Sequence, residues 1–265
     1  MSDTVIRLRD RRGRLVASAG VPLDIDVVER AGFAPLLARY PQAVGRRFEL
    51  VVLALLAASL ISIGTLAVRI DKTHSPRYLF LVWNLFLAWV PLIAAYYASA
   101  LARRRVGVAA GALMVVWLLF FPNAPYVLTD FIHLSEDANG ASPLWYDALM
   151  LLAFAWTALM LGFISLYLIH AIIGRRAGAA VGWAAVVCVF GLTSIGVYLG
   201  RFAHVNSWDA VTRPRLVLSV IRKATDSPFH DPKMFTAMLA LTVSLFIGYL
   251  VVYAFSALRP NASEA

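Results

Sequence analysis

The longest uncharged segment of the chain is ALMLLAFAWTALMLGFISLYLIHAIIG, residues 148–174. A helix needs about 20 consecutive apolar residues to cross a lipid bilayer, because each residue advances the helix by about 1.5 Å. Five further uncharged segments of comparable length flank it, at residues 50–68, 78–102, 106–129, 177–200 and 234–258. We therefore predict an all-α integral membrane protein, built as a bundle of six transmembrane helices.

The composition agrees with this class and excludes a soluble enzyme. The chain is 61% hydrophobic and 15% charged, whereas soluble domains have about 45–50% apolar and about 25% charged residues. The six uncharged segments hold 144 of the 265 residues, which is more than half of the chain. The net charge of +9 does not indicate nucleic-acid binding, because the basic residues lie between apolar segments and not on a soluble module.

The ends of the chain differ from this central part. Residues 1–47 contain nine Arg and no apolar stretch typical of a cleaved signal peptide, so we predict a basic N-terminal tail. Residues 48–258 then form the membrane domain and residues 259–265 a short C-terminal tail. Within the tail, Leu23–Arg39 is either a short interfacial helix or loosely ordered. The single cysteine, Cys188, permits no intramolecular disulfide, and we interpret it as a small core residue.

The distribution of basic residues predicts the orientation in the membrane. Loops rich in Lys and Arg tend to remain cytoplasmic. With the N-terminus inside, the cytoplasmic segments carry 15 Lys and Arg and the opposite segments carry nine. The loop at residues 122–145 has three acidic residues and no Lys or Arg. Both termini are therefore predicted to be cytoplasmic, with that loop outside.

Two prolines interrupt the third span. Pro122 and Pro125 remove backbone donors and disfavour a helical backbone at Phe121 and Ala124, so we predict a break in the helix. Broken helices at membrane depth are typical of transport and catalytic sites. The alternative interpretation is a helix that simply ends at the interface.

A carboxylate and an imidazole follow the break. If a helix resumes, Asp130 and His133 are three residues apart and share one face. Such a pair suits proton transfer, since His titrates near neutral pH and a carboxylate can orient it. The alternative is that Asp130 caps a helix and His133 lies at the interface. A metal site would need further ligands, from Asp147, His204, Asp209 or His230, and we predict none.

Other polar residues lie at the ends of neighbouring spans. Asp147 follows Trp145 and Tyr146 and is placed to cap the fourth span. Arg201 is suited to an anionic headgroup or to an ion pair with Asp130 or Asp147. Asn84, inside the second span, is expected to bond to a neighbouring helix.

Alternation of the six spans brings these residues to one membrane face. We predict a polar pocket there, with Asp130, His133 and Asp147 as catalytic candidates and Asn84, Asn123, Arg201, Asn206 and Asp209 as substrate-binding candidates. An amphipathic helix at residues 214–224 is expected to lie on the same side, with Pro214 at its start. On the opposite side, His170 is expected to be an interfacial residue.

At these residues the chain resembles a bacterial family of predicted membrane proteins, domain of unknown function 1361. The matching segments are WNLFLAWVPL at 83–92, FPNAPY at 121–126 with TDFIHL at 129–134, WYD at 145–147, and GRF to NSWD across 200–209. The likeness covers roughly residues 50–256. It implies a multi-pass protein of the bacterial inner membrane and supplies no activity.

Two hypotheses for the function remain. In the first, the pocket binds a lipid headgroup or a lipid-linked substrate and performs group transfer or hydrolysis, with His133 as general acid and base. In the second, the protein is a small transporter or an assembly or scaffold factor without catalysis. The partner in the first hypothesis is membrane lipid. The sequence leaves the cofactor and the oligomeric state unknown.

Overall fold

The computed structural model describes residues 8–9, 15–17, 46–136, 142–202, 209–216, 218–219, 222 and 232–257. The chain divides into two units, residues 1–39 and residues 40–265. In the first unit, strands β1 (Leu8–Arg9) and β2 (Leu15–Ala17) pair in the antiparallel sense. The predicted interfacial helix at Leu23–Arg39 lies outside the described residues. The boundaries predicted for the tails stay a prediction.

The described part of the second unit is helical. Its elements are α3 (Arg46–Thr73), α4 (Phe80–Arg103), α5 (Gly107–Phe120), α6 (Asn123–Tyr126), the 3₁₀ helix η2 (Val127–Ile132), α7 (His133–Glu136), α8 (Leu144–Ala177), α9 (Ala179–Phe202), α10 (Asp209–Thr212) and α12 (Pro232–Ala257). Six stretches are long and apolar enough to cross a membrane: Phe48–Thr73, Phe80–Arg103, Gly107–Ile132, Leu144–Ala177, Ala179–Tyr198 and Met238–Ser256. The prediction of six apolar spans is confirmed.

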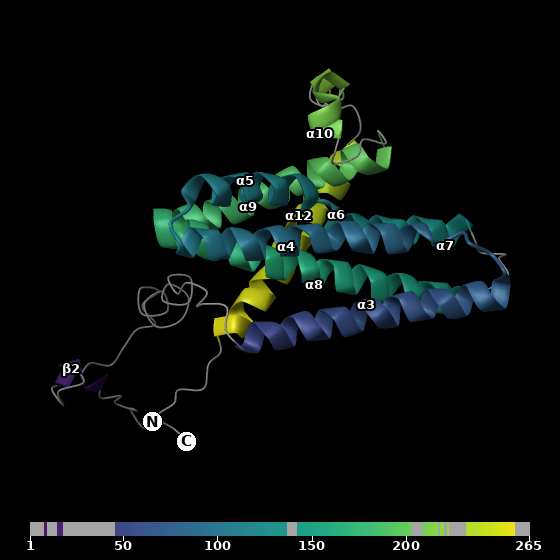
Figure 1. Ribbon diagram of the computed structural model, residues 1–265, viewed down its shortest axis with the longest axis horizontal. Helices are drawn as coiled ribbons and strands as arrows, with labels where there is room; N and C mark the ends of the chain where they lie inside the picture. Colours follow the sequence, from purple (N-terminus) through teal and green to yellow (C-terminus); the bar gives the residue numbers. More distant parts are fainter. Residues whose placement is uncertain are drawn as a thin grey trace, which may run out of the picture. The chain divides into compact units, whose positions relative to one another are not determined.

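Helix α8 is the centre of the bundle. It contacts α3, α4, α9 and α12, and Figure 1 shows α3 and α4 running alongside it while α12 crosses at a steep angle. With 34 residues, α8 is about 51 Å long, so its ends reach beyond a hydrocarbon core of about 30 Å. Its largest fully buried side chains include Phe154, Leu161 and Leu166.

Small polar side chains link the spans inside the apolar core. The Trp89 indole donates to Ser59 Oγ at 3.1 Å, joining α4 to α3. The Trp117 indole donates to Ser165 Oγ at 3.0 Å, joining α5 to α8. Two hydroxyl pairs, Ser62 with Thr157 and Ser194 with Thr242, join α3 to α8 and α9 to α12. Interhelical hydrogen bonds of this kind stabilise helix association where water is absent.

The third span changes its helix type at the two prolines but keeps helical backbone angles. Helix α5 ends at Phe120, and α6, η2 and α7 follow with only a two-residue turn between α5 and α6. The prediction that Phe121 and Ala124 leave the helical region is wrong, because Phe121 has φ −55° and ψ −39° and Ala124 lies within α6. Because Pro125 has no N–H to donate to the Phe121 carbonyl oxygen, that oxygen accepts from Ala124 N at 3.1 Å instead. The third span is therefore a continuous helical path that tightens into a 3₁₀ helix at Val127–Ile132.

Successive spans run in opposite directions, so the residues at their termini gather at one or the other end of the bundle. We call the two ends the Asp147 end, where α3 finishes and α8 begins, and the His170 end, where α8 finishes. At the His170 end, the His170 side chain is 3% exposed and its Nδ1 lies 2.9 Å from Tyr249 Oη. The imidazole also lies edge-on to Trp183, with ring centroids 4.8 Å apart. The prediction that His170 is interfacial is therefore wrong, because aromatic side chains of α9 and α12 enclose it.

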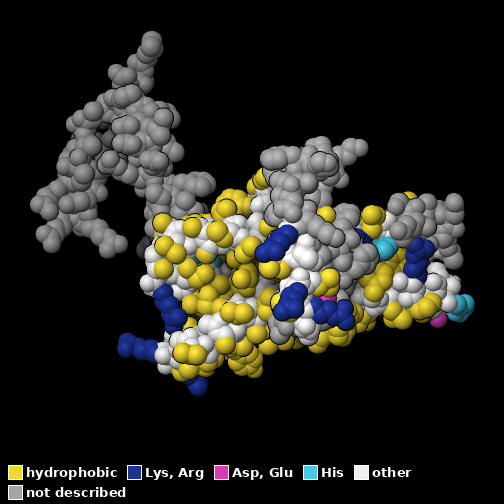
Figure 2. All heavy atoms as spheres, turned by 90° about the horizontal axis from the view of Figure 1, so that it is seen from above, with side chains coloured by type: hydrophobic (Ala, Val, Ile, Leu, Met, Phe, Trp, Pro, Cys, Tyr) yellow, Lys and Arg dark blue, Asp and Glu magenta, His cyan; other side chains and the backbone are white. Residues whose placement is uncertain are grey.

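The outer surface of the spans is apolar. Large hydrophobic side chains such as Leu53, Trp156 and Phe255 are exposed, and Figure 2 shows hydrophobic side chains over much of the face that it draws. Cys188 is also exposed, so its interpretation as a core residue is wrong. Of the predicted amphipathic segment 214–224, residues 214–216, 218–219 and 222 are helical, and Leu216 and Leu218 are exposed. Its other residues lie outside the described part.

Candidate functional site

The polar side chains at the Asp147 end form two clusters with different partners. The first is built around Asp130 in η2, with Asn84 from α4 and Arg201 from α9. The second is built around Asp147 in the first turn of α8, with Arg69 from the end of α3. Of the eight residues predicted from the sequence, three are in direct contact, and Asp147 is paired with a residue that was not among them.

The Asp130 carboxylate is buried and accepts hydrogen bonds from two other spans. Its side chain is 1% exposed. Asn84 Nδ2 donates to Asp130 Oδ2 at 3.0 Å, and Arg201 Nη1 donates to Asp130 Oδ1 at 3.4 Å. The interpretation of Asp130 as a helix cap is therefore wrong, since the carboxylate lies within η2 and binds side chains of two other spans. The Asp130 carboxylate therefore holds the Arg201 guanidinium and the Asn84 amide in place.

Arg201 stands at the rim of this cluster. Its side chain is 16% exposed, compared with 1% for Asp130, so it is the member of the pair that can be reached from outside. Its Nη2 donates to the Thr129 carbonyl oxygen at 2.5 Å, and its guanidinium lies 5.7 Å from the centroid of the Tyr126 ring. These contacts hold the cation in one orientation. Such a preorganised guanidinium is suited to bidentate recognition of phosphate or carboxylate.

The Asp147 cluster is an ion pair closed off from solvent. Arg69 Nε donates to Asp147 Oδ1 at 2.8 Å and Arg69 Nη2 to Asp147 Oδ2 at 3.1 Å, and the two side chains are 3% and 2% exposed. The Arg69 guanidinium also lies 4.4 Å above the Tyr78 ring. The prediction that Asp147 caps α8 is wrong, because the N-cap residue is Pro143 and no side chain caps that end. The pair instead joins the first span to the fourth.

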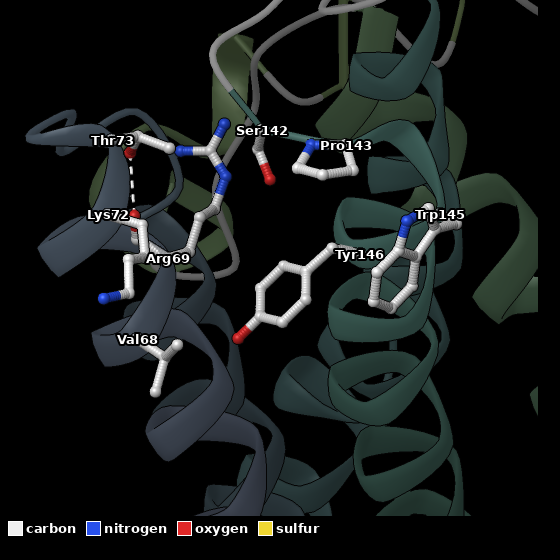
Figure 3. Close-up of a pocket in the computed structure, with 8 residues that line it drawn as sticks. All are labelled: Val68, Arg69, Lys72, Thr73, Ser142, Pro143, Trp145 and Tyr146. Carbon is white, nitrogen blue, oxygen red and sulfur yellow. Dashed lines mark hydrogen bonds between the residues drawn. The ribbon is translucent and has the colours of Figure 1, made fainter.

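A small cavity lies beside this ion pair. It has a volume of about 110 Å³ and is lined by residues of α3, of α8 and of the turn before α8: Val68, Arg69, Lys72, Thr73, Ser142, Pro143, Trp145 and Tyr146. Figure 3 shows the Arg69 side chain reaching from α3 toward Ser142 and Pro143, and the Tyr146 ring pointing from α8 toward α3. Tyr146 Oη donates to the Thr65 carbonyl oxygen at 2.8 Å, which joins α8 to α3 beside the cavity.

The other predicted residues have separate positions. Asn123 Nδ2 donates to the Phe120 carbonyl oxygen at 2.9 Å, which compensates an acceptor left by the proline turn. The His133 ring lies edge-on to Phe80, with centroids 5.2 Å apart, and Tyr78 Oη donates to the His133 carbonyl oxygen at 3.4 Å. Asp209 is buried at the start of α10. Asn206 lies outside the described residues. The roles predicted for these residues stay predictions.

The described residues hold no group of three His, Cys, Asp or Glu side chains close enough to bind a metal ion. Asp130 and His133 are near in sequence, but the side chains that donate hydrogen bonds to Asp130 are an amide and a guanidinium. Donors of that kind stabilise a carboxylate and do not act as metal ligands.

The sequence analysis did not identify Arg69 as a site residue, because Arg69 directly follows the uncharged segment 50–68 that defined the first span. The criterion of an uncharged run stops the first span at Val68, whereas α3 continues for five residues to Thr73. An Arg can lie inside such a helix when a carboxylate of another span neutralises it. The signal available in the sequence was the alternation of the spans, which brings the end of the first span and the start of the fourth to the same end of the bundle.

The fold and these clusters define a multi-pass membrane protein with two buried polar clusters at one end of its bundle. Residues 83–262 match the model of the family described as protein of unknown function (DUF1361), and the chain belongs to this family. The resemblance seen in the sequence motifs is confirmed. No curated protein and no solved structure matches the chain. Helix α3 lies before the matched residues. Its Arg69 nevertheless pairs with Asp147, which is one of the matched residues.

Proposed function

We propose that this protein binds the phosphate of a lipid headgroup or lipid-linked substrate at the Asp130 cluster. The observation that carries the proposal is the position of Arg201, a partly exposed guanidinium held by the buried Asp130, the Thr129 carbonyl and the Tyr126 ring. The cluster lies at an end of the bundle, where headgroups lie in a bilayer. Asp130 and Asn84 position the cation, and Arg201 contacts the phosphate.

The proposed chemistry is hydrolysis or group transfer at that phosphate. Water or a substrate hydroxyl forms a bond to phosphorus while the ester oxygen leaves. His133 accepts the proton of the attacking group and returns it to the leaving oxygen. His133 has this role because it directly follows η2 and is partly exposed, whereas both oxygens of Asp130 are already engaged.

The packing between the two ends counts against transport of a charged solute. A transport path requires polar groups or a cavity through the middle of the bundle. At that depth the side chains of Phe121, Phe154 and Phe190 are fully buried in the hydrophobic core. The hydroxyl and indole groups of the spans bond to one another.

His133→Gln and Arg201→Gln are expected to accumulate in membranes like the wild type and to lose function. Loss of a general acid and base reduces turnover by about 100-fold or more, and loss of the guanidinium weakens phosphate binding. The measurement is mass spectrometry of the lipids and lipid-linked precursors of cells that carry each variant as the sole copy. Arg176→Gln, an exposed change at the His170 end of α8, is the matched control.

Asp130→Asn separates positioning from chemistry in the same assay. The isosteric amide keeps the bond to Asn84 possible but removes the charge that orients Arg201, so we expect a change in the lipid profile smaller than that of Arg201→Gln. Lipid profiles identical to the wild type for both His133→Gln and Arg201→Gln would exclude the Asp130 cluster as the site.

We further propose that the Asp147 end faces the outside of a bacterial inner membrane, with both termini in the cytoplasm. The excess of Lys and Arg on the other side supports this orientation. In a Cys188→Ala background, single cysteines at Asn139 and Ser227 are expected to react with a membrane-impermeant maleimide in intact cells. Reaction of both only after permeabilisation would reverse the orientation, and reaction of one alone would contradict the six-span alternation.

A further inference from the structure

We infer that Tyr78 is a positioning residue for His133, and that it connects the buried Arg69–Asp147 ion pair to the proposed reaction. Tyr78 lies in the turn that precedes α4. The inference deepens the proposed function and rests on it, because His133 is the general acid and base proposed above. It gives the ion pair a role in the site in addition to its role in stability.

The phenol group of Tyr78 is buried beside the end of the third span. Tyr78 is 0% exposed, and the hydroxyl group of a buried tyrosine normally has a hydrogen-bond partner. Tyr78 Oη donates to the His133 carbonyl oxygen at 3.4 Å. His133 lies where η2 ends and α7 begins. The bond therefore joins the start of the second span to the backbone that carries the imidazole.

The ion pair fixes the ring of Tyr78. The Arg69 guanidinium lies 4.4 Å from the centroid of that ring, within the roughly 6 Å at which a cation and an aromatic face attract each other. Arg69 is itself held by two bonds to Asp147, of 2.8 and 3.1 Å. Arg69 and Tyr78 are both buried, and the attraction is stronger where water is excluded. The ring therefore has one preferred orientation, which directs its hydroxyl group toward His133.

A second aromatic contact reaches the side chain of His133 from the same end of α4. Phe80 is the first residue of α4, and its ring centroid lies 6.0 Å from that of Tyr78. The Phe80 ring also meets the His133 imidazole edge-on, with centroids 5.2 Å apart and planes at 62°. Tyr78 therefore holds the backbone of His133, while Phe80 limits the rotation of its ring.

His133 needs support from another span because its own segment is short. It lies between η2, which has six residues, and α7, which has four. Helices this short are not stable by themselves and depend on tertiary contacts. A general acid and base must be held within about 0.5 Å of its productive geometry. The contacts from Tyr78 and Phe80 supply this support, and the Arg69–Asp147 pair holds Tyr78 in place.

The experiment measures how fast diethyl pyrocarbonate modifies each histidine of the purified full chain in detergent, resolved by mass spectrometry of its peptides. Tyr78→Phe keeps the ring over Arg69 and removes the hydroxyl group, so we expect the His133 imidazole to react severalfold faster. His74 is exposed and serves as the internal reference. His170 is 3% exposed and reports opening of the whole bundle, so its rate should stay unchanged.

Tyr146→Phe is the matched control for loss of a hydroxyl group. Tyr146 lies at the same end of the bundle, and its bond to the Thr65 carbonyl oxygen measures 2.8 Å. This variant should leave the His133 rate unchanged. Tyr78→Leu also removes the ring, so it should both release His133 and lower the melting temperature. A wild-type His133 rate in Tyr78→Phe would overturn the inference, as would an equal rise of the His170 rate, which would indicate a general loss of stability.

Lipid profiles separate the failure of the inference from the failure of the proposed function. Cells with Tyr78→Phe as the sole copy should show a change in the same direction as His133→Gln, but a smaller one. An altered profile in His133→Gln, with a wild-type His133 rate in Tyr78→Phe, would overturn the inference alone. Faster modification of His133 in Tyr78→Phe, with wild-type profiles in both His133→Gln and Arg201→Gln, would overturn the proposed function and leave Tyr78 as a packing residue.

Discussion

Arg69→Ala is expected to remove most of the folded protein from the membrane. The substitution leaves the Asp147 carboxylate, 2% exposed, without the two guanidinium bonds of 2.8 and 3.1 Å. Breaking a buried ion pair by removing one partner costs about 3–5 kcal/mol, a large part of a typical stability of about 5–15 kcal/mol. The measurement is the yield of monodisperse protein after detergent extraction, together with its melting temperature. Asp147→Asn removes the charge of the other partner of the ion pair and should have a similar effect.

The double variant Arg69→Met, Asp147→Leu is the decisive control. Replacing both partners of a buried pair with apolar residues of similar volume is often neutral or stabilising, so the double variant should recover the yield that each single variant loses. Lys72→Gln, one turn further along α3, controls for loss of an exposed cation. A double variant as unstable as the single variants would contradict a purely structural pair. A double variant that is stable but inactive in cells would favour the catalytic role predicted for Asp147.

Gly182→Leu and Gly196→Leu are expected to destabilise the bundle, whereas Gly191→Leu in the same helix is not. A Cβ at Gly182 would lie 2.9 Å from His170 Cδ2 and 3.4 Å from Gly174 Cα, and a Cβ at Gly196 would lie 2.9 Å from Pro122 Cγ. At Gly191 a Cβ meets no atom within 4 Å. Overpacking of a tight interface costs about 1–3 kcal/mol. The three melting temperatures in detergent test the prediction directly.

The two glycines permit different contacts, which gives the prediction a second readout. Close approach at Gly182 lets the His170 ring lie against Trp183 while its Nδ1 meets Tyr249 Oη at 2.9 Å. Close approach at Gly196 seats the proline turn of the third span against α9. Gly182→Leu should therefore alter the environment of Trp183, as seen in its fluorescence, while Gly196→Leu leaves that signal unchanged. Equal destabilisation by Gly191→Leu would show that helix packing is not the cause.

Several contacts of the candidate site could be expected from the sequence. The bond from Asn84 to a neighbouring helix follows from the cost of an unpaired amide inside a membrane, and its partner is Asp130. The ion pair of Arg201 with Asp130 was one of two pairings that the charges allowed. The proline turn was predictable at Pro122, but its backbone stayed helical because neighbouring backbone N–H groups and the Asn123 side chain donate to carbonyl oxygens of the turn.

Other features were beyond the reach of pattern analysis. From its place near two arginines, His170 was predicted to be an interfacial residue. It is buried instead, because Gly182 lets α9 approach it closely and Tyr249 of α12 contacts its ring. The polar residues at the Asp147 end were expected in one pocket, yet Asp147 and Asp130 belong to separate clusters. Two carboxylates near one another repel, and each is stabilised by its own guanidinium.

The number, order and alternation of the six spans follow from the sequence alone, because whether a segment crosses a membrane depends on its own length and polarity. The choice of partners was decided only by the tertiary structure. Whether Asp147 meets Arg69 or Arg201 depends on the rotation of each helix about its axis and on which helices are neighbours. Those quantities are set by contacts between residues far apart in the chain, such as Gly196 against Pro122 and Tyr146 against Thr65, and no local pattern records them.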